Sequence, residues 1–232
     1  MSPLIKKNRK KLINNSIILI KYPKSSKNSR EKKVQHHLLF LHWNSNFLAL
    51  LYSLVKIMVR LALKIFCRKL SVHNARLLER RGPLLIVANH PNSFLDAIII
   101  GSLFKVPVHY LARGDAFNKP MNGTMLRLLH MIPVYRMSEG RESVFLNEAA
   151  FARSKDILSQ KGIVLIFIEG ICVHKHALQP FKKGAAKIAL DSAGIPGFGI
   201  QPITIAYDSF EQFGKRVNIV IGENIPVAKL FP

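Results

Sequence analysis

The sequence predicts an α/β domain built on a largely parallel central sheet flanked by helices. Short apolar runs alternate with helical stretches from about residue 80 onward, and this order of elements is typical of a parallel sheet. Proline and glycine fall near the boundaries between these stretches. With 232 residues, of which 49% are hydrophobic, the chain fits one domain with a large buried core.

Six apolar runs have the length of buried strands and are bounded by turn-forming residues. Because ligands of such domains bind beyond the carboxyl ends of the strands, residues that follow these runs are the first candidates for a site. The expected strands are residues 84–89, 107–112, 132–135, 163–168, 200–206 and 217–222.

Four helical stretches lie between these runs. Pro120 suits a first helical turn, because a residue there leaves its N–H unpaired in any case. Gly162 and Gly194 suit C-terminal caps. The expected helices are residues 93–104, 120–130, 141–160 and 182–192.

Residues 1–45 are expected to form a basic, flexible arm. Within residues 1–35, eleven Lys and Arg stand against one acid, Glu31, so this segment holds +10 of the net charge of +22. Such a balance fits a partner rich in phosphate, either a nucleic acid or an anionic membrane surface, and composition alone does not choose between them. A solvated tail is the other interpretation of the arm.

Residues 46–80 are expected to form an amphipathic, membrane-associating helical segment. Lys56, Arg60 and Lys64 are spaced by four, which makes one basic stripe on an otherwise apolar helix. A spanning helix would bury three cations at roughly 2.5 to 3.5 kcal/mol each. We therefore expect the helix to lie in the lipid interface, with the stripe on headgroup phosphates. An ordinary helix that packs on the core is the alternative.

The sequence shows no signal peptide, because the early apolar run at residues 16–20 is short and lacks a cleavage site. We expect the α/β part, residues 81–232, to lie on the cytoplasmic face of a membrane as a monotopic or peripheral protein. Cys67 and Cys172 have neither metal-ligand nor redox spacing and are expected to be reduced and structural.

The segment Asn-His-Pro-Asn-Ser-Phe-Leu-Asp at residues 89–96 follows an expected strand and opens an expected helix. An imidazole titrates near neutral pH, and a carboxylate on its other nitrogen would orient it. His90 and Asp96 are therefore candidates for a general base and its partner. The competing interpretation is a helix start, with Ser93 as N-cap and Asp96 as the acidic third residue.

This segment resembles motif I of the glycerolipid acyltransferase superfamily, the PlsC-like lysophosphatidate and glycerol-phosphate acyltransferases. The resemblance implies that His90 and Asp96 act as a charge-relay pair. Five residues separate them, where most members have four, and this spacing is similar to the branch that includes fungal glycerol-phosphate acyltransferases. The resemblance runs from about residue 82 to 224, so residues 81–232 are expected to be an acyltransferase domain.

Phe167-Ile-Glu-Gly170, with the Pro-Phe-Lys-Lys-Gly element at 180–184, resembles motif III of the same superfamily. The resemblance implies that Glu169 and Gly170 help to hold the acceptor. A carboxylate that only structures its loop is the other interpretation of Glu169.

Two departures from motif III are visible. Ile168 replaces a proline, and Ile-Cys-Val at residues 171–173 stands where many members have Thr-Arg-Ser, so a phosphate-binding Arg is absent. Lys175, Lys182 or Lys183 is expected to take its place.

Two weaker matches complete the set. Arg136 follows a short run as the basic residue of motif II does, and a planar guanidinium suits bidentate binding of phosphate. Pro202 resembles the proline of motif IV, which implies a part in the acyl pocket, although prolines also begin many edge strands.

The resemblance implies a membrane-associated O-acyltransferase of phospholipid biosynthesis. His90 would deprotonate the hydroxyl of a lysophosphatidate- or glycerol-3-phosphate-like acceptor, which attacks an acyl-CoA or acyl carrier protein thioester without a cofactor. Backbone amides at residues 93–96 are expected to stabilise developing negative charge. Acylation of ornithine-type aminolipids is the alternative. A nucleic-acid partner is not expected, because aromatic and basic residues do not interleave, and Cys172, His174 and His176 lack the further ligand that a metal needs.

Overall fold

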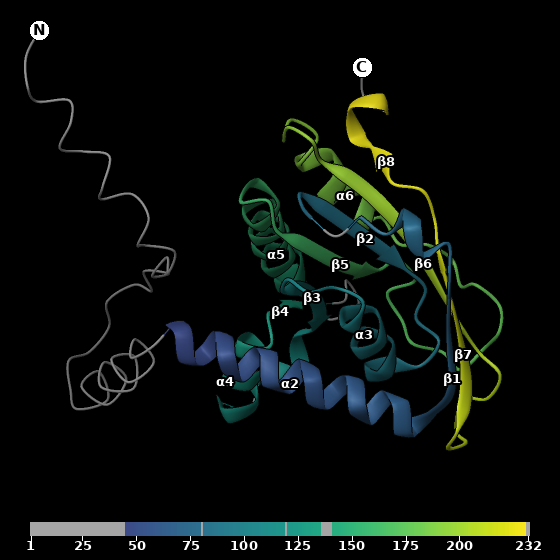
Figure 1. Cartoon of the computed structure of the whole chain (residues 1–232). Coiled ribbons are helices and arrows are strands. Elements are labelled where there is room, and N and C mark those ends of the chain that lie inside the picture. Colours follow the sequence, from purple (N-terminus) through teal and green to yellow (C-terminus); the bar gives the residue numbers. More distant parts are fainter. Residues whose placement is uncertain (1–44, 80, 119, 136–140, 231–232) are drawn as a thin grey trace, which may run out of the picture. The chain divides into compact units, whose positions relative to one another are not determined.

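The computed structural model describes residues 45–79, 81–118, 120–135 and 141–230 (Figure 1). The chain divides into two units, residues 1–50 and 51–232. The first is described only from Ser45 to Leu50, so the expected arm at residues 1–45 lies almost entirely outside the described residues. The account below concerns the second unit.

The second unit is an α/β fold whose central sheet has eight strands in the order β1-β7-β6-β2-β5-β3-β4, with β8 paired to β6. Most neighbours are parallel, and only β6–β7 and β6–β8 are antiparallel. The strands are β1 (Cys67–His73), β2 (Leu84–Ala88), β3 (Val108–Arg113), β4 (Met131–Val134), β5 (Ile163–Phe167), β6 (Gly199–Tyr207), β7 (Lys215–Ile221) and β8 (Ile225–Pro226). The helices are α2 (Ser45–Phe66), α3 (Ser93–Ser102), α4 (Pro120–Leu128), α5 (Arg141–Ser159) and α6 (Gly184–Asp191).

The hydrophobic core lies in two layers, one on each face of the sheet. Successive residues of a strand point to opposite faces, and on β2 Leu84 and Ile86 join one layer while Leu85 joins the other. All three side chains are fully buried, and each such burial stabilises the fold by about 1.5 to 3 kcal/mol. The first layer includes residues of α2 and α3, and the second includes residues of α5 and α6.

Every expected strand and helix between residues 84 and 222 is present, with ends shifted by a few residues. The segment 46–80 differs, because it is helical only as far as Phe66. Residues 67–73, which we expected to continue the helical segment, form β1 and pair with β7. Pro202 also differs from an edge-strand proline, because β6 lies inside the sheet between β2 and β7.

The C-terminal end of α5 shows how the chain turns into a central strand. The N–H of Gly162 bonds to the carbonyl of Ile157 and that of Lys161 to Leu158, which is the Schellman arrangement. The residue with positive φ is Lys161, at 61°, and not the expected Gly162. A Cβ on Gly162 would lie 2.5 Å from Ile157 Cγ2, so close packing explains this glycine.

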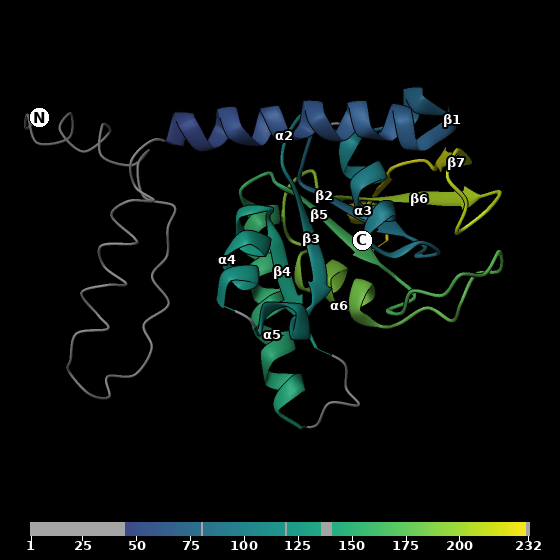
Figure 2. The ribbon, with the colours of Figure 1, turned by 90° about the horizontal axis from the view of Figure 1, so that it is seen from below.

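Two of the three cations of helix α2, Lys56 and Arg60, bond to carbonyls of the protein. Lys56 Nζ donates to the carbonyls of Phe104 and Val106 at 2.8 and 3.1 Å, and Arg60 donates to the carbonyl of Ser102 at 3.0 and 3.2 Å. These carbonyls lie at and just beyond the C-terminal end of α3, where a helix favours positive charge. Both ribbon views place α3 beside α2 (Figures 1 and 2). The expectation that the whole stripe faces headgroup phosphates is therefore wrong for Lys56, whose ammonium bonds to two carbonyls, while the exposed guanidinium of Arg60 bonds in part to the carbonyl of Ser102.

The outward face of α2 is apolar instead. Leu54, Ile57, Met58, Leu61 and Ile65 follow helical spacing, and each leaves more than half of its side chain exposed, up to 72% for Ile65. No helix in the described part of the chain is long and apolar enough to cross a membrane.

A cluster of ionisable groups lies where α2 meets β3. The ring of His109 on β3 lies 4.9 Å from that of His130, which in turn lies 5.2 Å from the ring of Tyr52 on α2. Burial lowers the pKa of His109 from 6.5 to about 4, and the neighbouring His130 acts in the same direction. The folded protein therefore holds a neutral imidazole at a pH where the unfolded chain takes up a proton.

This cluster predicts how stability depends on pH. As the pH falls from 6.5 toward 4, the unfolded state binds a proton at His109 that the folded state rejects, so the free energy of unfolding decreases. In His109→Gln, we expect that decrease to be smaller by roughly 1 kcal/mol, a figure reduced for partial exposure. Urea unfolding at several pH values measures the free energy of unfolding of each variant, and His73→Gln, which changes an exposed histidine, is the control. Identical pH dependence in the wild type and His109→Gln would contradict this assignment.

Candidate active site

His90 and Asp96 meet at the carboxyl end of β2. The strand ends at Ala88, the chain turns through residues 89–92, and α3 begins at Ser93, so His90 lies in the turn and Asp96 in the first turn of the helix. His90 Nδ1 lies 3.0 Å from Asp96 Oδ2. Asp96 is fully buried, whereas the side chain of His90 is 20% exposed. The pair therefore has one member in the protein interior and one at the surface.

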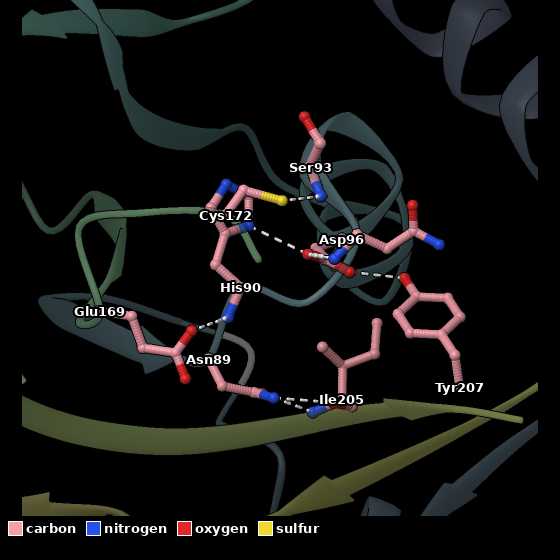
Figure 3. A network of polar contacts seen from close by, with 9 residues as sticks. Asn89, His90, Ser93, Asp96, Glu169, Cys172, Ile205 and Tyr207 are labelled. Carbon is pink, nitrogen blue, oxygen red and sulfur yellow. Dashed lines mark hydrogen bonds and ion pairs between the residues drawn. The ribbon is translucent and has the colours of Figure 1, made fainter. Parts of the chain in front are cut away.

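The buried carboxylate of Asp96 is held by three donors. Besides His90, the backbone N–H of Asn92 donates to Oδ2 at 2.7 Å, and the hydroxyl of Tyr207 donates to Oδ1 at 2.6 Å (Figure 3). A buried charge needs such partners, because desolvation would otherwise favour its neutral form. Burial, and then the negative charge of Asp96, raises the pKa of Tyr207, so its hydroxyl stays protonated and able to donate.

This arrangement determines which nitrogen of His90 carries the proton. An ionised carboxylate only accepts hydrogen bonds, so the imidazole places its proton on Nδ1 and leaves the lone pair on Nε2. The His90 ring also stacks on Phe167, with centroids 3.8 Å apart and planes 12° apart. An imidazole held on one edge and one face has a single orientation, which suits a general base.

Asp96 also supports the start of α3, so the two interpretations of this segment are compatible. The residue before the helix is Asn92, not Ser93, and its side chain makes no capping bond. The N–H of Asn92 is instead satisfied by Asp96. The same oxygen, Oδ2, thus holds the backbone of the turn and the ring of His90.

Glu169 ties the loop after β5 to the turn that carries His90. Its Oε2 accepts the backbone N–H of His90 at 3.1 Å, and its Oε1 accepts the N–H of Gln179 at 3.1 Å. The side chain is 3% exposed. Glu169 therefore structures the loop, as one of the two sequence interpretations held, and it also lines the hollow described below.

Residue 170 has a backbone conformation that favours glycine. Its φ is +64°, in the left-handed region that other residues rarely adopt, and a Cβ would lie 2.9 Å from Lys182 Cγ. The N–H of Lys182 donates to the carbonyl of Ile168 at 2.7 Å, which closes this loop against the segment before α6.

A hollow of about 120 Å³ adjoins the turn. Asn89 and Pro91 contribute from the turn, Thr204 and Ala206 from β6, and Glu169 and Lys175 from the long loop after β5. It therefore combines small side chains of a strand with a carboxylate and one lysine, Lys175.

The other expected binding residues lie elsewhere or outside the description. Lys182 and Lys183 are exposed and do not line this hollow. Pro202 lies on β6 two residues before the part of the strand that lines it. Arg136 lies outside the described residues.

The side chain of Cys172, in the loop after β5, lies beside the N-terminal end of α3. Its Sγ accepts the backbone N–H of Ser93 at 3.0 Å, and burial raises the pKa of its thiol. The N–H of Leu95 bonds to the carbonyl of Asn92. The expectation that the amides of residues 93–96 are available to stabilise negative charge is therefore wrong for Ser93 and Leu95.

Tyr207 and Asn89 are the site residues that sequence reasoning missed. The side chain of Asn89 bonds to both the N–H and the carbonyl of Ile205, at 2.8 and 2.9 Å, which ties the end of β2 to β6. Tyr207 lies 111 residues from Asp96 in sequence. Only the apolar alternation of β6 marks Tyr207 as buried, and nothing local indicates its partner.

A histidine oriented by a buried aspartate, at the carboxyl end of a parallel strand beside a hollow, is the arrangement expected of an α/β enzyme that uses a general base. Comparison with known proteins agrees with this class. Residues 69–206 match the model of the Acyltransferase family, and the chain belongs to that family.

Two relatives extend the comparison. A lysophosphatidylcholine acyltransferase from Drosophila melanogaster is 30% identical over 129 residues, which cover 55% of this chain and 22% of that protein. The chain thus corresponds to less than a quarter of that relative. The crystal structure of the 1-acyl-sn-glycerophosphate acyltransferase PlsC from Thermotoga maritima has the same fold, with a TM-score of 0.54 and 17% identity over 74% of this chain and 67% of that one.

The geometry predicts that Tyr207 positions Asp96. Tyr207→Phe removes one hydrogen bond to a buried charge, a contact worth about 1.5 to 3 kcal/mol, so we expect kcat to fall about tenfold or more with little change in KM. We also expect the acidic limb of the pH–rate profile to move, because the carboxylate that holds the imidazole has lost a donor.

Tyr110→Phe is the matched control. Tyr110 is a largely buried tyrosine of β3 that approaches Gly101 and not Asp96. A loss of stability without any change in the pH–rate profile of Tyr207→Phe would show that Tyr207 only packs.

Proposed function

We propose that the protein is a membrane-associated O-acyltransferase that moves a fatty acyl group from an acyl thioester to the free hydroxyl of a lysophospholipid or glycerol-phosphate acceptor. The observation that carries the proposal is the contact between His90 Nδ1 and Asp96 Oδ2 at 3.0 Å, beside a hollow lined by Glu169 and Lys175. Family membership supports the reaction type, and the relatives are enzymes named for lysophospholipid acceptors.

The proposed step begins with His90. Nε2 accepts the proton of the acceptor hydroxyl as its oxygen attacks the thioester carbonyl, so that an O–H bond breaks while a C–O bond forms. The imidazolium that results is stabilised by Asp96, whose own charge is held by Asn92 and Tyr207. The C–S bond then breaks, and the departing thiolate takes the proton back from Nε2. Acyl-CoA or acyl carrier protein supplies the thioester, and no cofactor takes part.

The acceptor phosphate is proposed to lie near Lys175, which is the one cation among the residues that line the hollow. Arg136, Lys182 and Lys183 remain proposed phosphate ligands on the resemblance alone. Gly170 lets the loop turn tightly beside Glu169, and Pro202 shapes β6 ahead of the strand residues that line the hollow.

Acylation of an aminolipid is the second candidate function. Ile171, Cys172 and Val173 replace the segment that supplies a phosphate-binding Arg in the family, and Cys172 Sγ is engaged with Ser93. A site with fewer cations tolerates an acceptor without phosphate, and the same base would serve an amine.

Membrane association is proposed through the outward face of α2. Leu54, Ile57, Met58, Leu61 and Ile65 form a continuous exposed apolar strip, and such strips mark interaction sites. A monotopic or peripheral position on the cytoplasmic leaflet would bring the lysolipid to His90 without extraction into water.

The first test of the proposal is transfer by the purified full-length protein. With an acyl-CoA donor, we expect transfer to lysophosphatidate, glycerol 3-phosphate or lysophosphatidylcholine, measured as thiol released and lipid formed. In His90→Ala we expect kcat/KM to fall by about 10² to 10⁴, the usual contribution of a general base.

Each contrary result has a distinct meaning. Transfer only to a lyso-ornithine lipid would favour the aminolipid candidate, and full activity in His90→Ala would remove His90 from the mechanism. His109→Ala is the control, because it changes a histidine of β3 that bonds to Ile163 and not to Asp96.

A separate test concerns α2. Placing charge on its apolar strip with Leu61→Asp and Ile65→Asp should reduce pelleting with phosphatidylcholine vesicles at least tenfold, because each large apolar side chain contributes about 1.5 to 3 kcal/mol when buried. Leu190→Asp with Leu230→Asp changes two exposed leucines away from α2 and serves as the control. Equal pelleting of both double variants would contradict attachment through α2.

A further inference from the structure

A groove lies between the C-terminal end of α2 and the edge strand β1. Its volume is about 460 Å³, within the range of ligand sites in proteins. Four of its lining residues are cations and none is an acid: Arg60 and Lys64 come from α2, Arg68 and Lys69 come from β1, and Ser102 also lines the groove. The groove lies at the opposite end of α3 from His90, because Ser102 is the last residue of that helix.

A β-bulge brings two of these cations into the same groove. Cys67 pairs with Lys215 and Lys69 with Arg216, so Arg68 is an extra residue without a partner in the ladder. In a regular strand, Arg68 and Lys69 would point to opposite faces of the sheet. The bulge redirects the chain locally, and both side chains are exposed and line the groove.

The positive charge of the groove is not neutralised within the described chain. Arg60 uses Nε and Nη2 on the carbonyl of Ser102, which leaves its charge in place. Ion pairs among the described residues involve none of Lys64, Arg68 and Lys69. Four cations around one hollow repel one another, and an anion placed among them would relieve that repulsion.

The surroundings of the groove identify the kind of anion. Leu61 and Ile65 of the apolar strip lie one residue from Arg60 and Lys64 along α2, and they are 51% and 72% exposed. Phe66 and Phe213 lie edge to face at the end of the same helix, with centroids 5.5 Å apart, and Phe213 is 70% exposed. Exposed aromatic and aliphatic side chains beside cations match a molecule with an anionic head and apolar tails.

We propose that the groove between α2 and β1 binds the phosphate headgroup of an anionic membrane phospholipid. The acyl chains of that lipid lie toward the apolar strip of α2, and the phosphate is held by Lys64, Arg68 and Lys69. This site is separate from the hollow beside His90, and the proposal rests only on the membrane association proposed above and not on the acyl-transfer chemistry.

Binding to vesicles of defined composition tests the proposal. The full-length protein is pelleted with phosphatidylcholine vesicles that contain or lack phosphatidylglycerol, and the preference for the anionic vesicles is the ratio of the two affinities. In Arg68→Gln with Lys69→Gln, we expect this preference to fall by about tenfold or more, because each cation at an anionic surface contributes substantially to binding. Binding to phosphatidylcholine alone should change little.

The matched control is Lys155→Gln with Lys161→Gln. These exposed lysines of α5 and its C-terminal turn remove the same charge from a different part of the surface, and both double variants keep the basic residues at 1–35. Circular dichroism compares their folding. A fall confined to the groove variant supports the site, whereas equal falls in both double variants, or no preference in the wild type, would overturn it.

Two further measurements separate this proposal from a nucleic-acid site and from the proposed acyl transfer. Loss of duplex DNA binding in the groove variant, with vesicle binding unchanged, would assign the groove to nucleic acid and overturn the lipid assignment. Acyl transfer in detergent micelles should be unaffected in the groove variant. If the wild type shows no acyl transfer but its vesicle binding depends on the groove, the proposed function is contradicted and the lipid site is supported.

Discussion

One buried negative charge organises this site. Asp96 has no exposed surface, so its carboxylate is stable as an anion only while donors surround it. The three donors come from the turn after β2, from the backbone before α3 and from the far end of β6. Each must be in place for the others to be useful, and the fold is therefore built to bring β6 beside the start of α3. The orientation of His90 is a consequence of that requirement.

The contact that could be predicted from residue spacing is the local one, whereas Glu169, Gly170 and Lys175 were predicted only from the resemblance. His90 and Asp96 lie six residues apart across a turn, so their contact follows from a strand, a turn and a helix in that order. Tyr207 and Asn89 were not predictable, because their contacts join segments more than a hundred residues apart and depend on which strands are neighbours in the sheet. The contact of Glu169 with the backbone of His90 was not predictable either, because it requires β5 to lie beside β2.

Two errors in the sequence reasoning have physical causes. The spacing of Lys56 and Arg60 correctly indicated one face of α2, but periodicity does not say whether that face meets solvent or protein. Long basic side chains can bond to the free carbonyls at the end of another helix, and here they do. Strand β1 was missed because Cys-Arg-Lys-Leu-Ser-Val-His has no clean alternation of apolar residues, and its bulge at Arg68 interrupts what alternation there is.

The pairing of β1 with β7 has a consequence for how the protein is made. β1 is translated well before its partner in the ladder, Lys215–Ile221. Until then its backbone groups have no complete sheet to join, and pairing across so long a stretch of chain is slow. The nascent chain therefore carries an unpaired strand until β7 has been made. Early contact with a lipid surface, or with a chaperone, would protect that strand until β7 is made.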